Sequence, residues 1–365
     1  MQRPVIGRLA PSPTGLLHMG NLRSLAVAWL AARRVGGTIC LRVEDLLPDM
    51  AAEIAPLLAD LAWIGLTCDP TGDSALPWPL PPPRSLVPAG VWLQSQRHAL
   101  YQQVVAALVA SGRAYPCVCT RKDIELAALA PHATDVALAY PGTCRGRFAT
   151  LWAAEAWERD QAKHAGRQPL GCAVRLIVPP GQFAFTDLCQ GQQQVDVATT
   201  AGDIVIRRKD GGFAYMLAVV VDDLALGVTE VVRGDDLLEV TGQQLAVYRV
   251  LAELGAQRGQ ALDDLQPFWQ RAATWLPPDH GHVALVVGDD GRRLAKRNQS
   301  LQLRALRRAG VTPSRVRGWV AHSLGLIGED WVDMAEQLDL QRLPRHQVRF
   351  GDAELATLLQ ARPAA

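Results

Sequence analysis

The sequence predicts an α/β protein built on a parallel β-sheet. An apolar run at residues 5–10 leads through a Pro/Gly turn at 11–15 to a helix-like run at 22–34, and a second apolar run at 38–43 ends in acidic residues. A strand–helix–strand unit of this spacing implies parallel strands joined by a right-handed crossover. Because ligands of such sheets bind beyond the carboxyl ends of the strands, we expect the functional site where these two runs end.

Length and composition favour a globular enzyme. The 365 residues are 49% hydrophobic, which argues against disorder and allows about two or three domains. The net charge of +1 means that any nucleic-acid binding must use local patches. The sequence has neither a signal-peptide pattern nor an apolar stretch of membrane-spanning length, and its seven cysteines are an odd count. We expect a cytoplasmic protein with free thiols, no membrane partner and a monomeric state.

The start of the first predicted helix is suited to phosphate. A helix N-terminus presents backbone N–H groups and the positive end of the helix dipole. The side chains of His18 and Asn21 can donate hydrogen bonds to phosphate oxygens, and Gly20 lets a base or ribose approach the backbone. An ordinary β-turn with a capping histidine would use the same residues.

Two strings in this part of the chain resemble a known enzyme family. PSPTGLLHMGN at 11–21 is similar to the first signature of the class I aminoacyl-tRNA synthetases, and RVED at 42–45 matches the R-x-E-D string of their glutamyl branch. The resemblance implies activation of L-glutamate by ATP, with Mg²⁺ accompanying the ATP. It also implies a set of glutamate-binding residues: Arg8, Leu9, Ala10, Pro11, Ser12, Glu44, Tyr215 and Arg233.

The charges of this set suit an acidic amino acid. Glu44 would pair with the α-ammonium, and Arg8 and Arg233 would bind a carboxylate through their planar forks. A neutral amide would leave this buried positive charge uncompensated, so the acid is preferred over its amide. From the residues alone, the alternatives are a surface ion pair for Glu44 and a place in the core for Tyr215.

Between the two halves of the site, the sequence predicts a helix at 54–64 and another at 101–108, capped by QSQR at 94–97. The proline-rich stretch at 70–88 has no helical or strand periodicity, so we expect a surface insertion.

Four residues carry the pattern C-x-C…Y-x-x-x-C. Cys117 and Cys119 are one residue apart and Cys144 follows some two dozen residues later, a spacing that suggests a zinc knuckle. The complete pattern, which includes Tyr140, resembles the zinc site of the glutamyl-queuosine synthetase group, so the resemblance implies a structural Zn²⁺ on Cys117, Cys119, Tyr140 and Cys144. Three unrelated buried thiols are the alternative, and His132 is a weaker candidate ligand.

The rest of the insertion is predicted as a helix at 151–167 and strands at 172–178 and 183–187, after which 202–208 is expected to re-enter the parallel sheet.

The strings at 213–223 and 228–235 resemble the family again, the second as a strand that ends in a Gly turn. A long amphipathic helix is expected at 238–254.

RLAKR at 293–297 is similar to the second class I signature, K-x-S-K. The resemblance implies that the Lys296 ammonium stabilises charge developing on the triphosphate. Arg293 preserves the charge of the first lysine, whereas Ala295 replaces the serine. The implied catalytic residues are His18, Asn21 and Lys296, and the implied ATP-binding residues are His18, Gly20, Asn21 and Lys296.

These patterns divide the chain into four regions. The resemblance implies an α/β class I synthetase fold: a Rossmann-type parallel sheet in halves at 1–115 and 201–300, split by a zinc-bearing insertion at 116–200 that contacts RNA, with a short helical tail at 301–365. We expect no anticodon-binding domain in this tail. Its basic helices suit either a phosphate backbone or a solvated face.

The resemblance is therefore to the glutamyl-queuosine group. It implies transfer of glutamate to queuosine at the wobble position of tRNA(Asp). A short glutamate–tRNA ligase that charges the tRNA 3′ end is the alternative. A non-catalytic RNA-binding relic is a second alternative, because Leu47 and Met50 stand where the family has Asp and Arg, and Ala295 replaces a serine.

Overall fold

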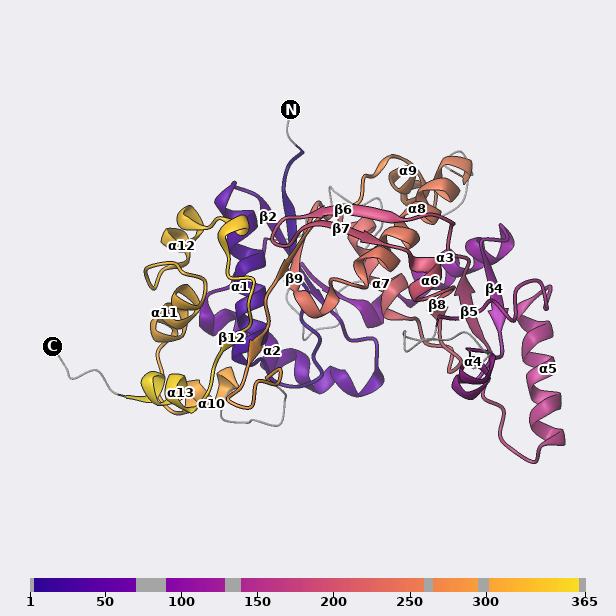
Figure 1. Ribbon diagram of the computed structural model, residues 1–365, viewed down its shortest axis with the longest axis horizontal. Coiled ribbons are helices and arrows are strands. Elements are labelled where there is room, and N and C mark those ends of the chain that lie inside the picture. Colours follow the sequence, from indigo (N-terminus) through magenta and orange to yellow (C-terminus); the bar gives the residue numbers. More distant parts are fainter. Residues whose placement is uncertain (1–2, 70–89, 129–138, 259–264, 295–301, 361–365) are drawn as a thin grey trace.

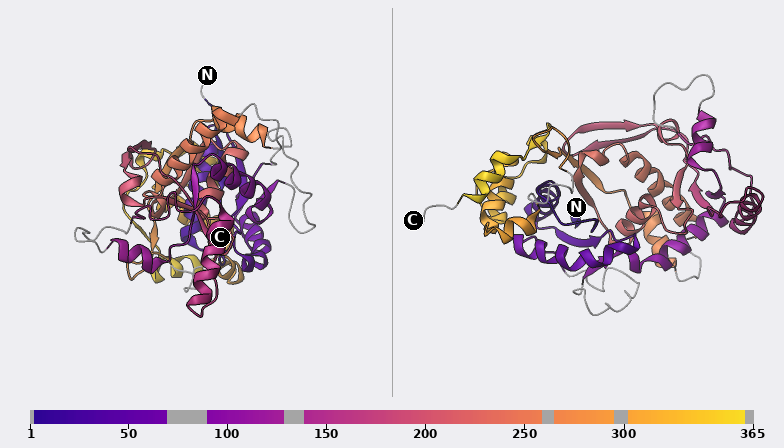
Figure 2. Two further views of the ribbon diagram at one scale, coloured as in Figure 1. Left: turned by 90° about the vertical axis from the view of Figure 1, so that its right-hand side faces the viewer. Right: turned by 90° about the horizontal axis from the view of Figure 1, so that it is seen from below.

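The computed structural model describes residues 3–69, 90–128, 139–258, 265–294 and 302–360. The predicted insertion at 70–88, the candidate ligand His132, and Ala295 and Lys296 lie outside these residues. Figure 1 shows an elongated molecule, with the C-terminal helices α10–α13 at one end and the segment around α5 at the other. The views in Figure 2 agree with this arrangement.

A three-stranded parallel sheet forms the N-terminal half of the core. It has the order β1 (Ile6–Leu9), β2 (Thr38–Val43) and β3 (Val91–Leu93), with β1 and β2 connected by α1 (Met19–Arg34). Helix α1 buries an apolar face that includes Leu22, and each such leucine contributes roughly 1.5–3 kcal/mol. The predicted strand–helix–strand unit is confirmed.

A second parallel pair, β9 (Glu230–Gly234) and β10 (Asp279–Val283), lies beside β1. Thr229 connects the two sheets, because its N–H donates to Ile6 O at 2.9 Å and its Oγ1 accepts from Ile6 N at 2.7 Å. The carboxyl ends of β1, β2 and β9 therefore meet in one region.

Helices α7 (Tyr215–Leu226), α8 (Thr241–Arg258) and α9 (Gln266–Thr274) pack with α3 (His98–Ala110) into a second apolar core. The predicted helices at 101–108 and 238–254 are confirmed, each with shifted ends.

The insertion contains an antiparallel sheet of β4 (Ala114–Cys117), β5 (Ala173–Leu176) and β8 (Ile204–Arg207). The prediction that 202–208 re-enters the parallel sheet is wrong. A buried carboxylate explains the difference: Asp203 accepts hydrogen bonds from the Tyr115 hydroxyl and from Val178 N, which ties the start of β8 to this sheet.

The remaining elements of the insertion are α4 (Arg121–Ala128), α5 (Leu151–His164), the hairpin β6 (Phe183–Asp187) and β7 (Gly191–Val195), and α6 (Val197–Thr200). Of these, α5 and β6 are predicted from the sequence, whereas α4, β7 and α6 are not.

Two further segments pack into the same apolar cluster as α1. One is a 3₁₀ helix at Pro48–Glu53 followed by α2 (Ile54–Ile64), as predicted. The other is the tail, with β11 (Val286–Val287), α10 (Leu303–Arg308), α11 (Pro313–Ser323), α12 (Trp331–Gln337), β12 (Val348–Arg349) and α13 (Asp352–Leu359). Within the described ranges, none of the helices combines the length and apolarity that a bilayer crossing requires.

Candidate functional site

A cavity of about 650 Å³ lies beyond the carboxyl ends of β1, β2 and β9 and beside the start of α1. It brings together the residues predicted from both halves of the chain: Arg8, Ala10, Pro11, Ser12, His18, Gly20, Asn21, Glu44, Tyr215 and Arg233. Among the described residues predicted to bind glutamate, Leu9 alone does not line the cavity, because it is fully buried in the core.

Two buried guanidinium groups border this cavity. Arg8 Nη1 donates to Val232 O at 3.2 Å, while its Nε lies 3.8 Å from Asp223 Oδ1 and has no hydrogen-bond partner among the described residues. Burial lowers the pKa of Arg8, and Asp223 partly opposes this. Arg233, only 6% exposed, donates from Nη2 to Thr241 Oγ1 at 2.8 Å. Such a pair favours a ligand that carries a carboxylate.

Glu44 is held from two sides at the same cavity. Ser12 Oγ donates to its Oε2 at 2.9 Å, and Arg42 Nη2 donates to its Oε1 at 3.1 Å. Arg42 is fully buried and also donates to Asp223 at 2.5 Å. Burial alone would lower the pKa of Arg42, but the carboxylates of Asp223 and Glu44 raise it well above its usual value. Glu44 is therefore an oriented anion that can accept from an ammonium group.

His18 caps helix α1. Its Nδ1 accepts hydrogen bonds from Gly20 N at 3.1 Å and Asn21 N at 3.4 Å, which places the ring proton on Nε2. A Cβ at residue 20 would lie 3.0 Å from the His18 ring, so any larger residue there would crowd the capping imidazole. Because the cap occupies both N–H groups, a phosphate would be bound by the side chains of His18 and Asn21 rather than by these backbone donors.

Tyr215 begins α7 and lines the cavity. Burial and the carboxylate of Glu44 raise the pKa of Tyr215, so its hydroxyl remains a neutral donor. Arg293 also lines the cavity and forms an ion pair with Asp236.

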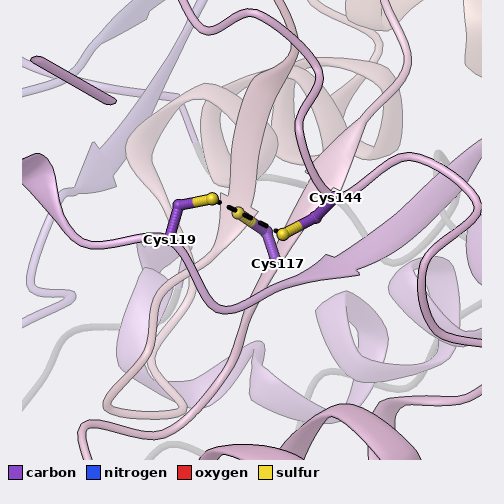
Figure 3. Close-up of side chains that lie close together, drawn as sticks. All are labelled: Cys117, Cys119 and Cys144. Atoms are coloured by element: carbon purple, nitrogen blue, oxygen red, sulfur yellow. Dashed lines mark hydrogen bonds between the residues drawn. The ribbon is translucent and has the colours of Figure 1, made fainter. Parts of the chain in front are cut away.

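A second group of predicted residues meets at the end of β4. The sulfurs of Cys117, Cys119 and Cys144 all lie within 4.8 Å of one another and converge on one point (Figure 3). The Tyr140 hydroxyl is 3.3 Å from the Cys117 sulfur, 3.5 Å from that of Cys119, and accepts from Cys144 N at 3.0 Å. The three cysteines can hold a metal ion, and the tyrosine oxygen lies beside two of their sulfurs.

The thiols of this cluster differ in pKa, since a hydrogen bond with Cys144 and burial raise the pKa of Cys117 to about 12. A hydrogen bond from Cys117 lowers the pKa of the Cys144 thiol to about 6, which supplies a thiolate near neutral pH. Arg175 donates from Nε to Cys117 Sγ at 3.4 Å, and its guanidinium lies 3.7 Å from the centre of the Tyr140 ring.

Several supporting residues escaped sequence reasoning. Arg42 stood inside the matched R-x-E-D string, yet nothing in the string indicates that it orients Glu44. His282 and Asp187, which support Arg233, are far apart in sequence and belong to no motif recognised above. Only the pairing of β9 with β10 brings His282 beside Arg233.

The family model for the catalytic domain of class I tRNA synthetases (E and Q) matches residues 4–258. The chain is 44% identical to a glutamyl-Q tRNA(Asp) synthetase from Nitratidesulfovibrio vulgaris, covering 88% of this chain and 86% of that protein. It is 38% identical to one from Symbiobacterium thermophilum, covering 96% and 98%. A glutamate–tRNA ligase 2 from Alkalilimnicola ehrlichii is 36% identical, covering 96% of this chain and 66% of the ligase.

The fold is also similar to solved structures. A crystal structure of a glutamate tRNA ligase from Elizabethkingia meningosepticum superimposes with a TM-score of 0.68 at 21% identity, covering 98% of this chain and 69% of that chain. This likeness concerns the fold alone.

Proposed function

The chain belongs to the class I tRNA synthetases of the glutamate and glutamine branch, and from this premise we propose that it activates L-glutamate with ATP and transfers it to queuosine of tRNA(Asp). Relatives that bear the name glutamyl-Q tRNA(Asp) synthetase support this choice within the branch. The observation that carries the proposal is the juxtaposition of Arg8, Arg233 and Glu44 at one cavity beside the start of α1.

The charges of the cavity fit glutamate with its three ionised groups. Arg8 and Arg233 bind the side-chain carboxylate, and Glu44 binds the α-ammonium while Ser12 and Arg42 fix its orientation. In this arrangement none of these arginines pairs with the α-carboxylate of glutamate. The α-carboxylate is therefore left to face the α-phosphorus of ATP. Binding energy from the two charged ends of the amino acid is thus used to orient the reacting group.

ATP occupies the part of the cavity beside the start of α1, near His18, Gly20 and Asn21. The glutamate α-carboxylate attacks the α-phosphorus, an oxygen–phosphorus bond forms, and the bond to the leaving pyrophosphate breaks. His18 and Asn21 donate hydrogen bonds to phosphate oxygens as negative charge shifts to the pyrophosphate. Lys296, outside the described residues, supplies the cation for that charge. Mg²⁺ enters with ATP, held by the triphosphate oxygens.

The second step requires no protein nucleophile. A hydroxyl of the queuosine cyclopentenediol attacks the glutamyl carbonyl, an ester bond forms, and the bond to AMP breaks, while the hydroxyl proton passes to the departing AMP phosphate. The contribution of the protein is to hold the adenylate and the nucleoside in register.

We assign a structural zinc ion to Cys117, Cys119, Tyr140 and Cys144. Three sulfurs and a phenol oxygen close together offer four ligand atoms, the number that structural zinc sites use, which supports this assignment. The ion would fix the turn after β4 to the segment at 140–144, and so order the end of the insertion that contacts RNA.

The deciding experiment is ATP–pyrophosphate exchange driven by L-glutamate without tRNA, followed by mapping of labelled glutamate on tRNA. Exchange together with label on the queuosine nucleotide of tRNA(Asp) is the expected result. Label on the 3′-terminal adenosine would favour the glutamate–tRNA ligase, a reading that the relative from Alkalilimnicola ehrlichii supports. Absence of exchange by folded protein would reject both enzyme functions.

A further inference from the structure

Three buried side chains, those of Asp187, His282 and Arg233, are connected in series by hydrogen bonds. Arg233 Nε donates to His282 Nε2 at 2.9 Å, and His282 Nδ1 lies 2.5 Å from Asp187 Oδ2. The side chains of His282 and Asp187 are completely buried, and Arg233 is 6% exposed. These residues come from β9, β10 and the end of β6, so three segments far apart in sequence converge here.

The hydrogen bonds determine the protonation of the histidine. Arginine has only donors, so Nε2 of His282 must be the unprotonated acceptor, and the ring proton must reside on Nδ1. Thr241 Oγ1 lies 3.2 Å from both Leu237 O and His282 Nε2, and its single hydroxyl proton can be donated to either, so Nε2 acts as an acceptor in both cases. His282 is therefore a neutral imidazole that donates to Asp187 and accepts from Arg233.

Asp187 is anchored to the backbone. Its Oδ1 accepts from the N–H groups of Cys189, Gln190 and His282 at 2.9, 2.8 and 3.1 Å. Although burial raises the pKa of Asp187, the hydrogen bonds from His282 and these N–H groups hold it below its usual value. The carboxylate is thus ionised and fixed, and it fixes the imidazole in turn.

The contacts of Arg233 show what this series of hydrogen bonds achieves. Nε is bound to His282, and Nη2 donates to Thr241 Oγ1 and to Leu237 O. Within the described residues, no hydrogen bond of Arg233 uses Nη1. The guanidinium is therefore held through Nε and Nη2. Its Nη1 remains available to a ligand in the cavity that Arg233 lines.

We propose that His282, anchored by Asp187, is a positioning residue that aims the Arg233 guanidinium at the side-chain carboxylate of glutamate and so enforces the choice of acid over amide. This inference rests on the proposed function and adds to it a residue that does not line the cavity. Without the imidazole acceptor, Nε of a buried guanidinium would lack a partner, and the group would turn to satisfy it.

The proposal implies a dependence on pH. The groups that face His282 are Asp187 from β6, Arg233 from β9, Arg8 from β1 and the parallel ring of His280, 6.2 Å away. Burial, assisted by Arg233 and Arg8, lowers the pKa of His282 below 6.5, although Asp187 opposes this. A proton gained in acid would convert the acceptor Nε2 into a donor that repels Arg233. Glutamate affinity should therefore decrease as the pH falls through this lowered pKa.

The test uses three variants of the full chain in tRNA-independent exchange. For His282→Phe we expect the KM for glutamate to rise about 10- to 100-fold, with the KM for ATP changed less than about threefold. Discrimination between glutamate and glutamine should fall by a similar factor. His282→Gln, whose amide can accept from Arg233 and donate to Asp187, should restore most of the affinity for glutamate. It should also abolish the loss of glutamate affinity at acidic pH.

His280→Phe is the matched control, since His280 is 3% exposed, lies on the same strand and stacks on His282, and among the described residues it makes no hydrogen bond to Arg233. It should damage packing as much as His282→Phe yet leave the glutamate-to-glutamine ratio unchanged. Equal effects of the two Phe variants on both KM values would mean a purely structural role and would overturn the proposal. Failure of the wild type to exchange would instead reject the proposed function, so the two failures are distinguishable.

Discussion

Arg42, in strand β2, donates a hydrogen bond at 3.1 Å to Glu44, which lies just beyond the end of the same strand. The guanidinium is fully buried and also binds Asp223 at 2.5 Å, so one cation is shared by two carboxylates from different elements. Truncation of one partner in such a group leaves another charge buried without compensation. Glu44 is therefore rigidly placed before any ligand arrives.

Glu44→Gln should lower kcat/KM for glutamate about 100-fold, because the amide cannot neutralise the α-ammonium, a loss of about 3 kcal/mol. ATP–pyrophosphate exchange at varied glutamate and saturating ATP measures this. Glu336→Gln, an exposed change on α12, is the control and should behave as wild type. A glutamate KM within about twofold of wild type would contradict the assignment of Glu44 to the ammonium.

The sequence predicted the residues that line the site better than the residues that hold them in place. Arg8 lies in β1 and Glu44 directly follows β2, and the strand–helix–strand pattern already implies that these strands are parallel, so their meeting could be foreseen. His282 could not be foreseen, because its role depends on the register of β10 against β9, which pairs it with Arg233. The placement of β8 was mistaken because a strand of four residues, three of them apolar, pairs equally well in a parallel or an antiparallel sheet.

Zinc removal tests the cysteine cluster. The purified chain should contain about one zinc per molecule, and Tyr140→Phe should weaken its retention against a chelator about 10- to 100-fold, because one of four ligands is lost. Metal content and competition with a colorimetric chelator measure this. Glutamate-dependent exchange without tRNA should persist, because none of the proposed ligands lines the cavity.

Cys172→Ala is the control for this prediction. Cys172 belongs to the same apolar cluster as the proposed ligands and its thiol donates to Cys117 O at 3.6 Å, but it is not one of the converging sulfurs. Its loss should leave the zinc content unchanged. Zinc-free wild-type protein with intact secondary structure would contradict the site.

Glu230 should make stability depend on pH. Burial and Asp279 raise its pKa from 4.5 to about 7, and its Oε1 has no hydrogen-bond partner among the described residues. Between these two values the folded chain retains a proton that the unfolded chain releases, so stability falls as the pH rises. Glu230→Gln should remove this penalty and stabilise the protein by about 1–2 kcal/mol at pH ~8, and much less at pH ~4.5, after allowance for partial exposure.

Urea unfolding of wild type and Glu230→Gln across this pH range measures the difference, with the exposed Glu239→Gln as control. The free energies of unfolding of wild type and Glu230→Gln should diverge as the pH rises. If the free energies of unfolding of the two proteins differ by the same amount at every pH, Glu230 ionises in the folded chain at its ordinary pKa.

The ion pair between Asp236 and Arg293 predicts an effect on ATP. Both residues line the cavity, and Arg293 opens the RLAKR string that includes Lys296. A guanidinium bound to Asp236 must leave it to contact a phosphate, so the carboxylate competes with the nucleotide. Because the Arg293 side chain is 55% exposed, the pair contributes at most about 1 kcal/mol.

Asp236→Asn should therefore lower the KM for ATP about two- to fivefold at saturating glutamate, since the competing charge is gone. Asp290→Asn is the control, because Asp290 is exposed and accepts from Arg292 N beside the pair without joining it. A rise in the KM for ATP would reverse the interpretation, because Asp236 would then align Arg293 for the triphosphate rather than compete for it. The direction in which Asp236→Asn changes the KM for ATP thus decides between two roles of the ion pair: it either holds Arg293 away from the triphosphate or aligns Arg293 to bind it.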